Sequence, residues 1–154
     1  MALQIGDLAP SFTLYSSEKQ EVSLSDYKGK KVVVLFFPLA FTGVCTEELC
    51  SVRDNIATYQ NLNTEVLAIS VDSLFSLEQF KKQQNLSFPL LSDFNKEVSA
   101  AYGALYDEFV LGMKGVSKRS AFVIDEEGKI LYAEVLEDAG QVPSFENIQK
   151  ALQA

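Results

Sequence analysis

The sequence contains no histidine, and it has only two arginines and two cysteines among its 154 residues. Without histidine there can be no Ser-His-Asp triad and no Cys-His nucleophile pair. Structural zinc sites usually take four cysteine and histidine ligands, and two cysteines cannot fill such a set. We therefore expect no metal site, and any reactive cysteine must be activated by something other than an imidazole.

Long apolar runs and an excess of positive charge are also missing. No apolar stretch approaches the ~20 residues that a membrane-spanning helix requires. Residues 1–7 (MALQIGD) lack the basic and apolar regions of a secretory signal. A net charge of −8 repels phosphate backbones and anionic lipid surfaces. We therefore expect a cytoplasmic protein that binds neither nucleic acid nor membranes, in which the acidic charge serves solubility.

The composition and the hydrophobic pattern indicate one α/β domain spanning residues 1–154. Hydrophobic residues make up 47% and charged residues 22% of the chain, as in ordinary globular proteins. Apolar runs rich in β-branched and aromatic residues alternate with segments of helical pattern. The expected strands are 12–14, 22–24, 31–37, 65–71, 88–91, 120–124 and 130–135, and the expected helices are about 43–59, 77–84, 96–102 and 145–152. This order predicts a thioredoxin-like fold, with a central mixed β-sheet flanked by helices and an N-terminal β-hairpin.

Both cysteines lie in the segment 38–50 (PLAFTGVCTEELC), which connects a predicted buried strand to a predicted helix. In α/β folds such loops, at the carboxyl ends of strands, carry much of the chemistry. If Thr42 caps the helix, Cys45 becomes its third residue. Cys45 then lies near unpaired backbone N–H groups and the positive end of the helix dipole, and both stabilise a thiolate relative to a thiol.

Helical geometry places the two cysteines on different faces. At about 100° per residue, Cys45 lies on an apolar stripe, whereas Cys50 points about 140° away from it. The other members of the stripe are Leu49, Val52, Ile56 and Tyr59. In a regular helix the two Cα atoms are roughly 8.7 Å apart, and a disulfide needs about 7 Å or less. A bond between these cysteines would therefore require the helix to unwind locally.

The residues alone leave a structural role open. Free cysteines are often buried and inert. Glu47 and Glu48 would oppose a thiolate, although acidic residues also suit a helix N-terminus. A cation from elsewhere would have to offset them, and Arg119 is the candidate, although an arginine is more often a surface charge.

Several motifs resemble those of the peroxiredoxins. That family shares a P-x-x-x-[TS]-x-x-C segment, which here reads Pro38, Thr42 and Cys45, and a distant arginine, which here is Arg119. Further matching segments lie at 6–12, 30–38, 68–72, 88–93, 101–103 and 118–125. The resemblance covers nearly the whole chain and implies a thiol-dependent peroxidase without a bound cofactor, because sulfur carries the electrons.

The resemblance also implies a role for each residue of the site. Cys45 would attack hydrogen peroxide or an organic hydroperoxide and become a sulfenic acid. Pro38 would shield the thiolate from water, and Glu48 would help to orient an arginine. The donors expected to hold the peroxide are Arg119, the Thr42 hydroxyl and the backbone N–H groups of Val44 and Cys45.

The spacing Cys-x-x-x-x-Cys resembles the bacterioferritin-comigratory-protein subgroup, in which the second cysteine resolves the oxidised first one. Cys50 would then form an intramolecular disulfide that thioredoxin or a similar dithiol protein reduces. The segment 36–43 (FFPLAFTG) also resembles the one-cysteine alkyl hydroperoxide reductase E group, but the presence of Cys50 favours the two-cysteine interpretation. Both a monomer and a homodimer remain open, with Phe41, Phe109 and Val110 as apolar residues that a dimer could use.

Three other functions compete with this interpretation. A thioredoxin-like oxidoreductase normally needs Cys-x-x-Cys, which is two residues shorter than the spacing here. A non-catalytic redox sensor or chaperone-like binding protein would be oxidised without efficient turnover. A purely structural protein would leave both thiols inert to peroxide.

Overall fold

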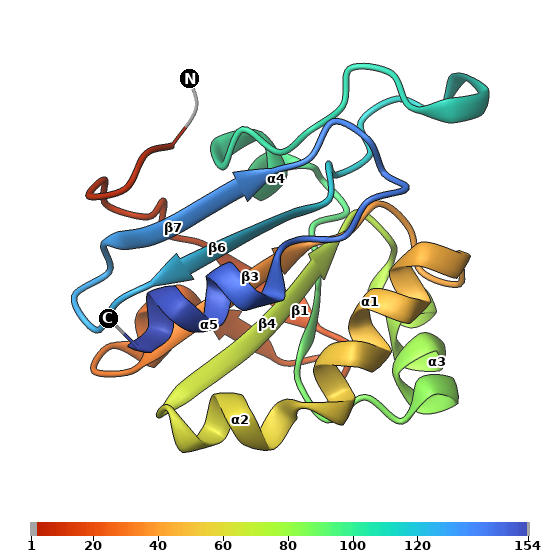
Figure 1. The fold of residues 1–154 in the computed structure, drawn as a ribbon. Coiled ribbons are helices and arrows are strands. Elements are labelled where there is room, and N and C mark those ends of the chain that lie inside the picture. Colours follow the sequence, from red (N-terminus) through yellow and green to blue (C-terminus); the bar gives the residue numbers. More distant parts are fainter. Residues whose placement is uncertain (1–2, 154) are drawn as a thin grey trace.

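The computed structural model describes residues 3–153, in which strands and helices alternate along the chain (Figure 1). The strands are β1 (Thr13–Ser16), β2 (Glu21–Ser23), β3 (Lys31–Phe36), β4 (Thr64–Ser70), β5 (Leu90–Ser92), β6 (Ser120–Ile124) and β7 (Ile130–Val135). The α-helices are α1 (Gly43–Asp54), α2 (Ile56–Asn61), α3 (Leu74–Gln84), α4 (Glu97–Ala101) and α5 (Phe145–Gln153). The short 3-10 turns are η1 (Leu24–Tyr27) and η2 (Val110–Gly112).

The strands form one mixed sheet in the order β2-β1-β5-β4-β3-β6-β7. The three neighbours β3, β4 and β5 run parallel, and the outer strands pair antiparallel. The predicted mixed sheet with flanking helices and an N-terminal hairpin is therefore confirmed. Because parallel strands end at the same edge, the loops that follow β3, β4 and β5 meet there.

The central strand β3 is buried on both faces of the sheet. Its side chains alternate between two apolar clusters, as the period of two in a strand requires. Val33 and Leu35 belong to one cluster, and Val32, Val34 and Phe36 belong to the other. A run of apolar residues without polar alternation is what such a strand needs.

Helices cover both faces of this sheet. In Figure 1, α1, α2 and α5 lie in front of the sheet and α4 lies behind it. The front cluster contains Leu49 and Val52 of α1, and also apolar residues of α2, α3 and α5. The rear cluster contains Val98 of α4 and the neighbouring Tyr102. Packing against the front cluster fixes α1, the helix that carries both cysteines.

One predicted element is wrong in its extent. The expected helix 43–59 is divided into α1 and α2 at Asn55, whose φ of −113° and ψ of 17° are not helical. The Asn55 side chain donates a hydrogen bond of 2.8 Å to the Ser51 carbonyl oxygen and so competes with the helical backbone pattern. The apolar stripe nevertheless continues across the break, because Ile56 and Tyr59 still pack on the front cluster.

Two smaller differences concern element starts. Helix α3 begins at Leu74, three residues earlier than expected, because the Ser73 hydroxyl caps it by accepting a 3.2 Å bond from the Ser76 N–H. Strand β5 begins at Leu90 rather than Phe88, and Pro89 before it has no N–H to contribute to a ladder. Helix α5 is capped by Ser144, whose Oγ accepts a 3.2 Å bond from the Asn147 N–H.

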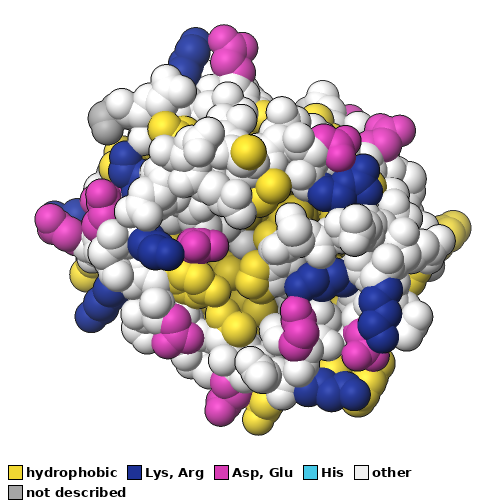
Figure 2. Space-filling view, turned by 90° about the horizontal axis from the view of Figure 1, so that it is seen from below, with side chains coloured by type: hydrophobic (Ala, Val, Ile, Leu, Met, Phe, Trp, Pro, Cys, Tyr) yellow, Lys and Arg dark blue, Asp and Glu magenta, His cyan; other side chains and the backbone are white. Residues whose placement is uncertain are grey.

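The face seen from below carries charges of both signs. Lysine, arginine, aspartate and glutamate side chains alternate around its margin, and hydrophobic side chains gather near its middle (Figure 2). Such mixing gives this face no extended field of a single sign. Among residues 3–153, no helix has the length and apolar character that crossing a bilayer requires.

Candidate active site

The loop that leads into α1 places Cys45 in the first turn of the helix. Thr42 is the N-cap residue, with an extended φ of −95° and ψ of 157°, and α1 begins at Gly43. Cys45 is therefore the third helical residue, as the sequence indicated. The Thr42 hydroxyl does not cap the helix, because it donates to the Leu39 carbonyl oxygen at 2.7 Å. The first turn thus keeps backbone N–H groups that side chains do not occupy.

The Cys45 sulfur lies against a guanidinium group. Arg119 Nη2 donates a hydrogen bond to Cys45 Sγ at 3.1 Å. Cys45 is 1% exposed and borders the front cluster of the core. A buried sulfur in purely apolar packing would be inert, whereas this sulfur accepts a hydrogen bond from a permanent cation.

Arg119 is buried and held on several sides. It lies immediately before β6 and is 2% exposed. Nη1 donates to Glu48 Oε1 at 2.7 Å, and Nε and Nη2 donate to the Ala139 carbonyl oxygen at 3.2 and 3.0 Å. Burial lowers the pKa of Arg119, but the interactions with Glu48 and Cys45 raise this pKa by more than burial lowers it, so the net shift is upward. The guanidinium therefore stays charged in a fixed orientation.

Glu48 is the second charged group of the site. It lies one turn after Cys45 on α1 and is 1% exposed. Burial raises the pKa of Glu48 to about 7, although Arg119 beside it acts in the opposite direction. Among the described residues, Glu48 Oε2 has no hydrogen-bond partner. The carboxyl group therefore orients Arg119 with one oxygen and can change protonation near neutral pH.

Asp72, which follows β4, anchors the loop before the cysteine. Asp72 Oδ2 accepts bonds from the Ala40 N–H at 2.8 Å and from the Ser70 hydroxyl at 2.6 Å. Phe41, next to Ala40, has a φ of 68°, a left-handed conformation that costs about 1 kcal/mol for a residue with a side chain. Asp72 was not among the site residues predicted from the sequence. Its position directly after a predicted parallel strand was the available signal, because such strands end at one edge.

Cys50 has different surroundings from Cys45. It is half-buried, and its Sγ donates to Gln84 Oε1 on α3 at 3.4 Å. Both cysteines are free thiols in this structure. The sulfur of Cys50 therefore contacts α3, whereas that of Cys45 contacts Arg119, in agreement with the helical spacing.

The structure gathers part of the predicted site. Arg119 contacts both Cys45 and Glu48, and Pro38 is buried at the start of the loop. Val44 is half-buried beside Cys45 in the first turn. The Thr42 hydroxyl bonds to the loop rather than to the sulfur. Arg53, the chain's other arginine, contacts Asp54 and Gln84 instead of Cys45.

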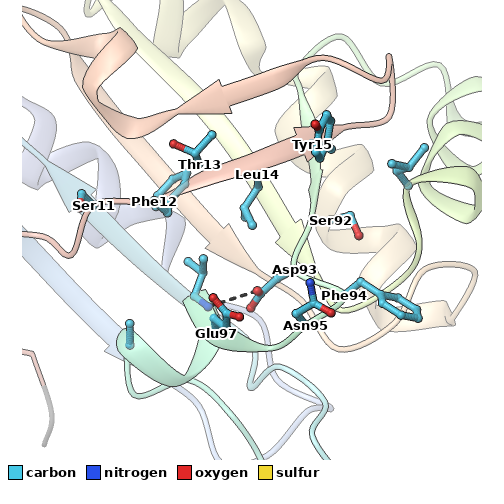
Figure 3. Close-up of a pocket in the computed structure, with 13 residues that line it drawn as sticks. Ser11, Phe12, Thr13, Leu14, Tyr15, Ser92, Asp93, Phe94, Asn95 and Glu97 are labelled. Carbon is cyan, nitrogen blue, oxygen red and sulfur yellow. Dashed lines mark hydrogen bonds between the residues drawn. The ribbon is translucent and has the colours of Figure 1, made fainter.

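A cavity of about 380 Å³ lies elsewhere, between β1, the end of β5 and α4 (Figure 3). Its lining includes none of the predicted site residues. Asp93 at its base accepts bonds from the Val98 and Ser99 N–H groups at 3.1 and 2.6 Å. Because both carboxylate oxygens hold the start of α4, Asp93 has a structural role.

Comparison with known proteins identifies relatives over most of the chain. The AhpC/TSA family matches residues 5–133. A Mycobacterium tuberculosis protein named a peroxiredoxin is 44% identical over 131 residues, which cover 84% of this chain and 83% of that protein. The peroxiredoxin named bcp of Coxiella burnetii is 42% identical and covers 84% and 87% of the two chains. Alkyl hydroperoxide reductase E of Mycobacterium tuberculosis is 40% identical and covers 86% of each.

Comparison with solved structures also finds proteins named as peroxiredoxins or as peroxiredoxin-like. A peroxiredoxin-like protein from Aquifex aeolicus superimposes with a TM-score of 0.89 at 26% identity, over 99% of this chain and 88% of that chain. The fold is therefore thioredoxin-like, as the sequence predicted. Relatives named bcp and alkyl hydroperoxide reductase E match at nearly equal identity, so the comparison favours neither subgroup. Together with the cysteine–arginine pair, the family match and these relatives show that the chain belongs to the AhpC/TSA family and is a peroxiredoxin.

Proposed function

We propose that this peroxiredoxin reduces hydrogen peroxide and organic hydroperoxides through Cys45. The main support is the 3.1 Å contact between Arg119 Nη2 and Cys45 Sγ in the first turn of α1. Two independent effects, a buried cation and the helix N-terminus, favour a thiolate at this point. Glu48 pairs with the same arginine, and Glu47 is exposed to solvent.

The first step transfers one oxygen atom to sulfur. The Cys45 thiolate attacks the terminal peroxide oxygen, the O–O bond breaks, and the leaving oxygen takes a proton to depart as water or an alcohol. Ionising a free cysteine fully at neutral pH gains only about thirtyfold, or roughly 2 kcal/mol. Hydrogen-bond donors that stabilise charge on the leaving oxygen must contribute more.

The donors in this proposal come from Arg119 and from the first turn of α1 with its N-cap residue. Arg119 supplies a fixed guanidinium, and the first turn of α1 supplies the backbone N–H groups of Val44 and Cys45. The Thr42 hydroxyl donates to Leu39 in the present arrangement and would turn toward a bound peroxide. Pro38 shields the site from water, and Glu48 positions Arg119.

Cys50 resolves the oxidised enzyme in this proposal. Its thiol attacks the Cys45 sulfenic acid, a disulfide forms within the chain, and water leaves. Thioredoxin or a similar dithiol protein then reduces the disulfide. The two sulfurs lie on different faces of α1, so the helix must unwind locally before they can bond.

Peroxide consumption by single-cysteine variants tests the proposal. Cys45→Ser should abolish consumption, and turnover retained in that variant would refute the assignment. Cys50→Ser should keep the first oxidation but lose recycling by thioredoxin. Recycling at the wild-type rate in Cys50→Ser would instead support the one-cysteine cycle.

A further inference from the structure

The face of α1 that carries Cys50 is hydrogen-bonded to Gln84, at the end of α3. Cys50 Sγ donates to the Gln84 side-chain oxygen at 3.4 Å. Arg53 Nη1 donates to the Gln84 backbone carbonyl oxygen. Residues three apart on a helix face the same way, so Cys50 and Arg53 reach α3 together.

The position of Gln84 explains why its carbonyl is available. Gln84 is the last residue of α3, and the final carbonyl groups of a helix lack helical partners. Asn85, in the left-handed conformation, and Leu86 turn their N–H groups back to Lys81 and Lys82. The Gln84 carbonyl is left for Arg53, whose positive charge also suits the negative end of the helix dipole.

These contacts affect the step in which Cys50 attacks the Cys45 sulfenic acid, and the inference therefore rests on the proposed role of Cys50. In a regular helix the Cα atoms of Cys45 and Cys50 are roughly 8.7 Å apart, more than the about 7 Å that a disulfide allows. Cys50 must therefore leave Gln84 before its sulfur can reach the sulfenic acid. The broken contact is part of the barrier to that movement.

We propose that Gln84 is a positioning residue that holds Cys50 in its helical place and so sets how fast the disulfide forms. The side-chain oxygen retains the Cys50 thiol, and the backbone carbonyl retains Arg53 as the fixed end of the unwinding segment. When Cys50 is released, its S–H bond breaks and a Cys45–Cys50 S–S bond forms. The sulfenic C–S–OH loses its hydroxyl group, which leaves as water with the thiol proton.

This arrangement has a chemical consequence. While Cys50 stays docked, the sulfenic acid remains exposed to a second peroxide molecule, which would oxidise it to the sulfinic acid. Weakening the contact with Gln84 shortens that interval. A variant without the side-chain acceptor should therefore form the disulfide faster and accumulate less sulfinic acid.

The test compares Gln84→Met with Gln83→Met in the full chain. Both changes replace glutamine with a side chain of similar length, but Gln83 is exposed on the same turn of α3 and is not bonded to Cys50. After mixing with hydrogen peroxide, rapid acid quench, alkylation and mass spectrometry count the sulfenic, disulfide and sulfinic forms. We expect Gln84→Met to form the disulfide about threefold faster, with an unchanged rate for the first oxidation of Cys45. Gln83→Met should match the wild type.

A second variant separates the contact from a general loosening of α3. Gln84→Glu keeps a side-chain acceptor, so it should restore the wild-type rate or slow resolution further. Faster disulfide formation in Gln84→Glu, or an unchanged rate in Gln84→Met, would overturn the role of Gln84 but leave the proposed role of Cys50 intact. If the wild type itself formed no Cys45–Cys50 disulfide, the proposed role of Cys50 would fail, and this inference with it.

Discussion

The two faces of α1 present two cysteines in contrasting surroundings. Cys45 lies in the first turn, almost fully buried, with its sulfur on the guanidinium of Arg119. Cys50, five residues later, is half-buried and bonded to the neutral side chain of Gln84. The amino-acid type is the same at both positions, so the difference in expected chemistry comes from helix position and neighbours.

An arginine accompanies each face, and the contrast between the two is equally instructive. Arg119 is 2% exposed and is held by Glu48 and a backbone carbonyl. The Arg53 side chain is 30% exposed, and the pKa of Arg53 is raised chiefly by its bond to Asp54, with a smaller contribution from Cys50. A charge at the surface is screened by water and salt, whereas a buried one acts at nearly full strength. The burial of the cation, and not its proximity alone, therefore sets how strongly its charge acts on the neighbouring sulfur.

Removing each arginine is the strongest way to test this contrast. Arg119→Met should slow the first oxidation of Cys45 by about 10²- to 10³-fold, because a fixed donor to the leaving oxygen is lost. Arg53→Met should change that step less than about twofold, since a screened surface charge contributes little. Stopped-flow measurement of peroxide consumption under single-turnover conditions gives both rates.

A control for Arg119→Met is necessary because the buried Glu48 carboxyl group would lose its hydrogen-bond partner, and its pKa would rise further without the arginine. The double variant Arg119→Met, Glu48→Gln replaces that carboxyl group with a neutral amide while leaving the sulfur without its donor. It should oxidise as slowly as Arg119→Met. Similar losses for the variants of Arg119 and Arg53 would show that burial of the cation does not matter.

The two adjacent glutamates of α1 allow a second comparison. Folding raises the pKa of Glu48 from 4.5 to about 7, so between these values the folded state binds more protons than the unfolded state. The free energy of unfolding of the wild type should therefore fall by about 2 kcal/mol as pH rises from about 5 to about 7. Glu48→Gln should remove this loss, whereas Glu47→Gln, at an exposed position, should retain it.

Urea unfolding at pH values between 5 and 8 measures how the free energy of unfolding of each variant changes with pH. The comparison depends on the difference between the variants, so other titrating groups cancel to first order. A wild type whose stability did not fall relative to Glu48→Gln over this range would show that Glu48 is ionised throughout.

Two aspartates provide the smallest expected contrast. Asp72→Ala removes the acceptor of the Ala40 N–H and should reduce stability by about 1–3 kcal/mol. It should also slow peroxide reduction severalfold, because the loop before Cys45 loses its anchor. Asp54→Ala breaks only the exposed pair with Arg53 and should have a smaller effect on both. Thermal unfolding and single-turnover rates show which variant has the larger effect. Equal effects of the two substitutions would show that Asp72 does not support the site.

The sequence predicted the features that depend on local pattern. Strands β6 and β7 have their expected bounds, and Cys45 is the third residue of α1. The apolar run of β3 predicted burial on both faces because no polar residue interrupts it. Helical spacing alone also placed Cys50 on a different face from Cys45.

Features that depend on long-range contacts could not be predicted in the same way. The break at Asn55 arises from a side chain competing for a backbone oxygen, and asparagine within a helix gives only a weak signal. The contacts of Asp72 with Ala40 and of Gln84 with Cys50 join residues more than thirty positions apart. Such pairs follow from the packing of α1 and β4 with their neighbours, which no local pattern encodes.

The most direct test of the account is to identify which sulfur takes the first oxygen. Reduced protein mixed with less than one equivalent of hydrogen peroxide would be trapped within milliseconds by a sulfenic-acid reagent and mapped by mass spectrometry. We expect oxygen on Cys45 in the Cys50→Ser variant, and a Cys45–Cys50 bond within one chain in the wild type. Oxygen found first on Cys50, or Cys45 reacting no faster than free cysteine, would contradict it.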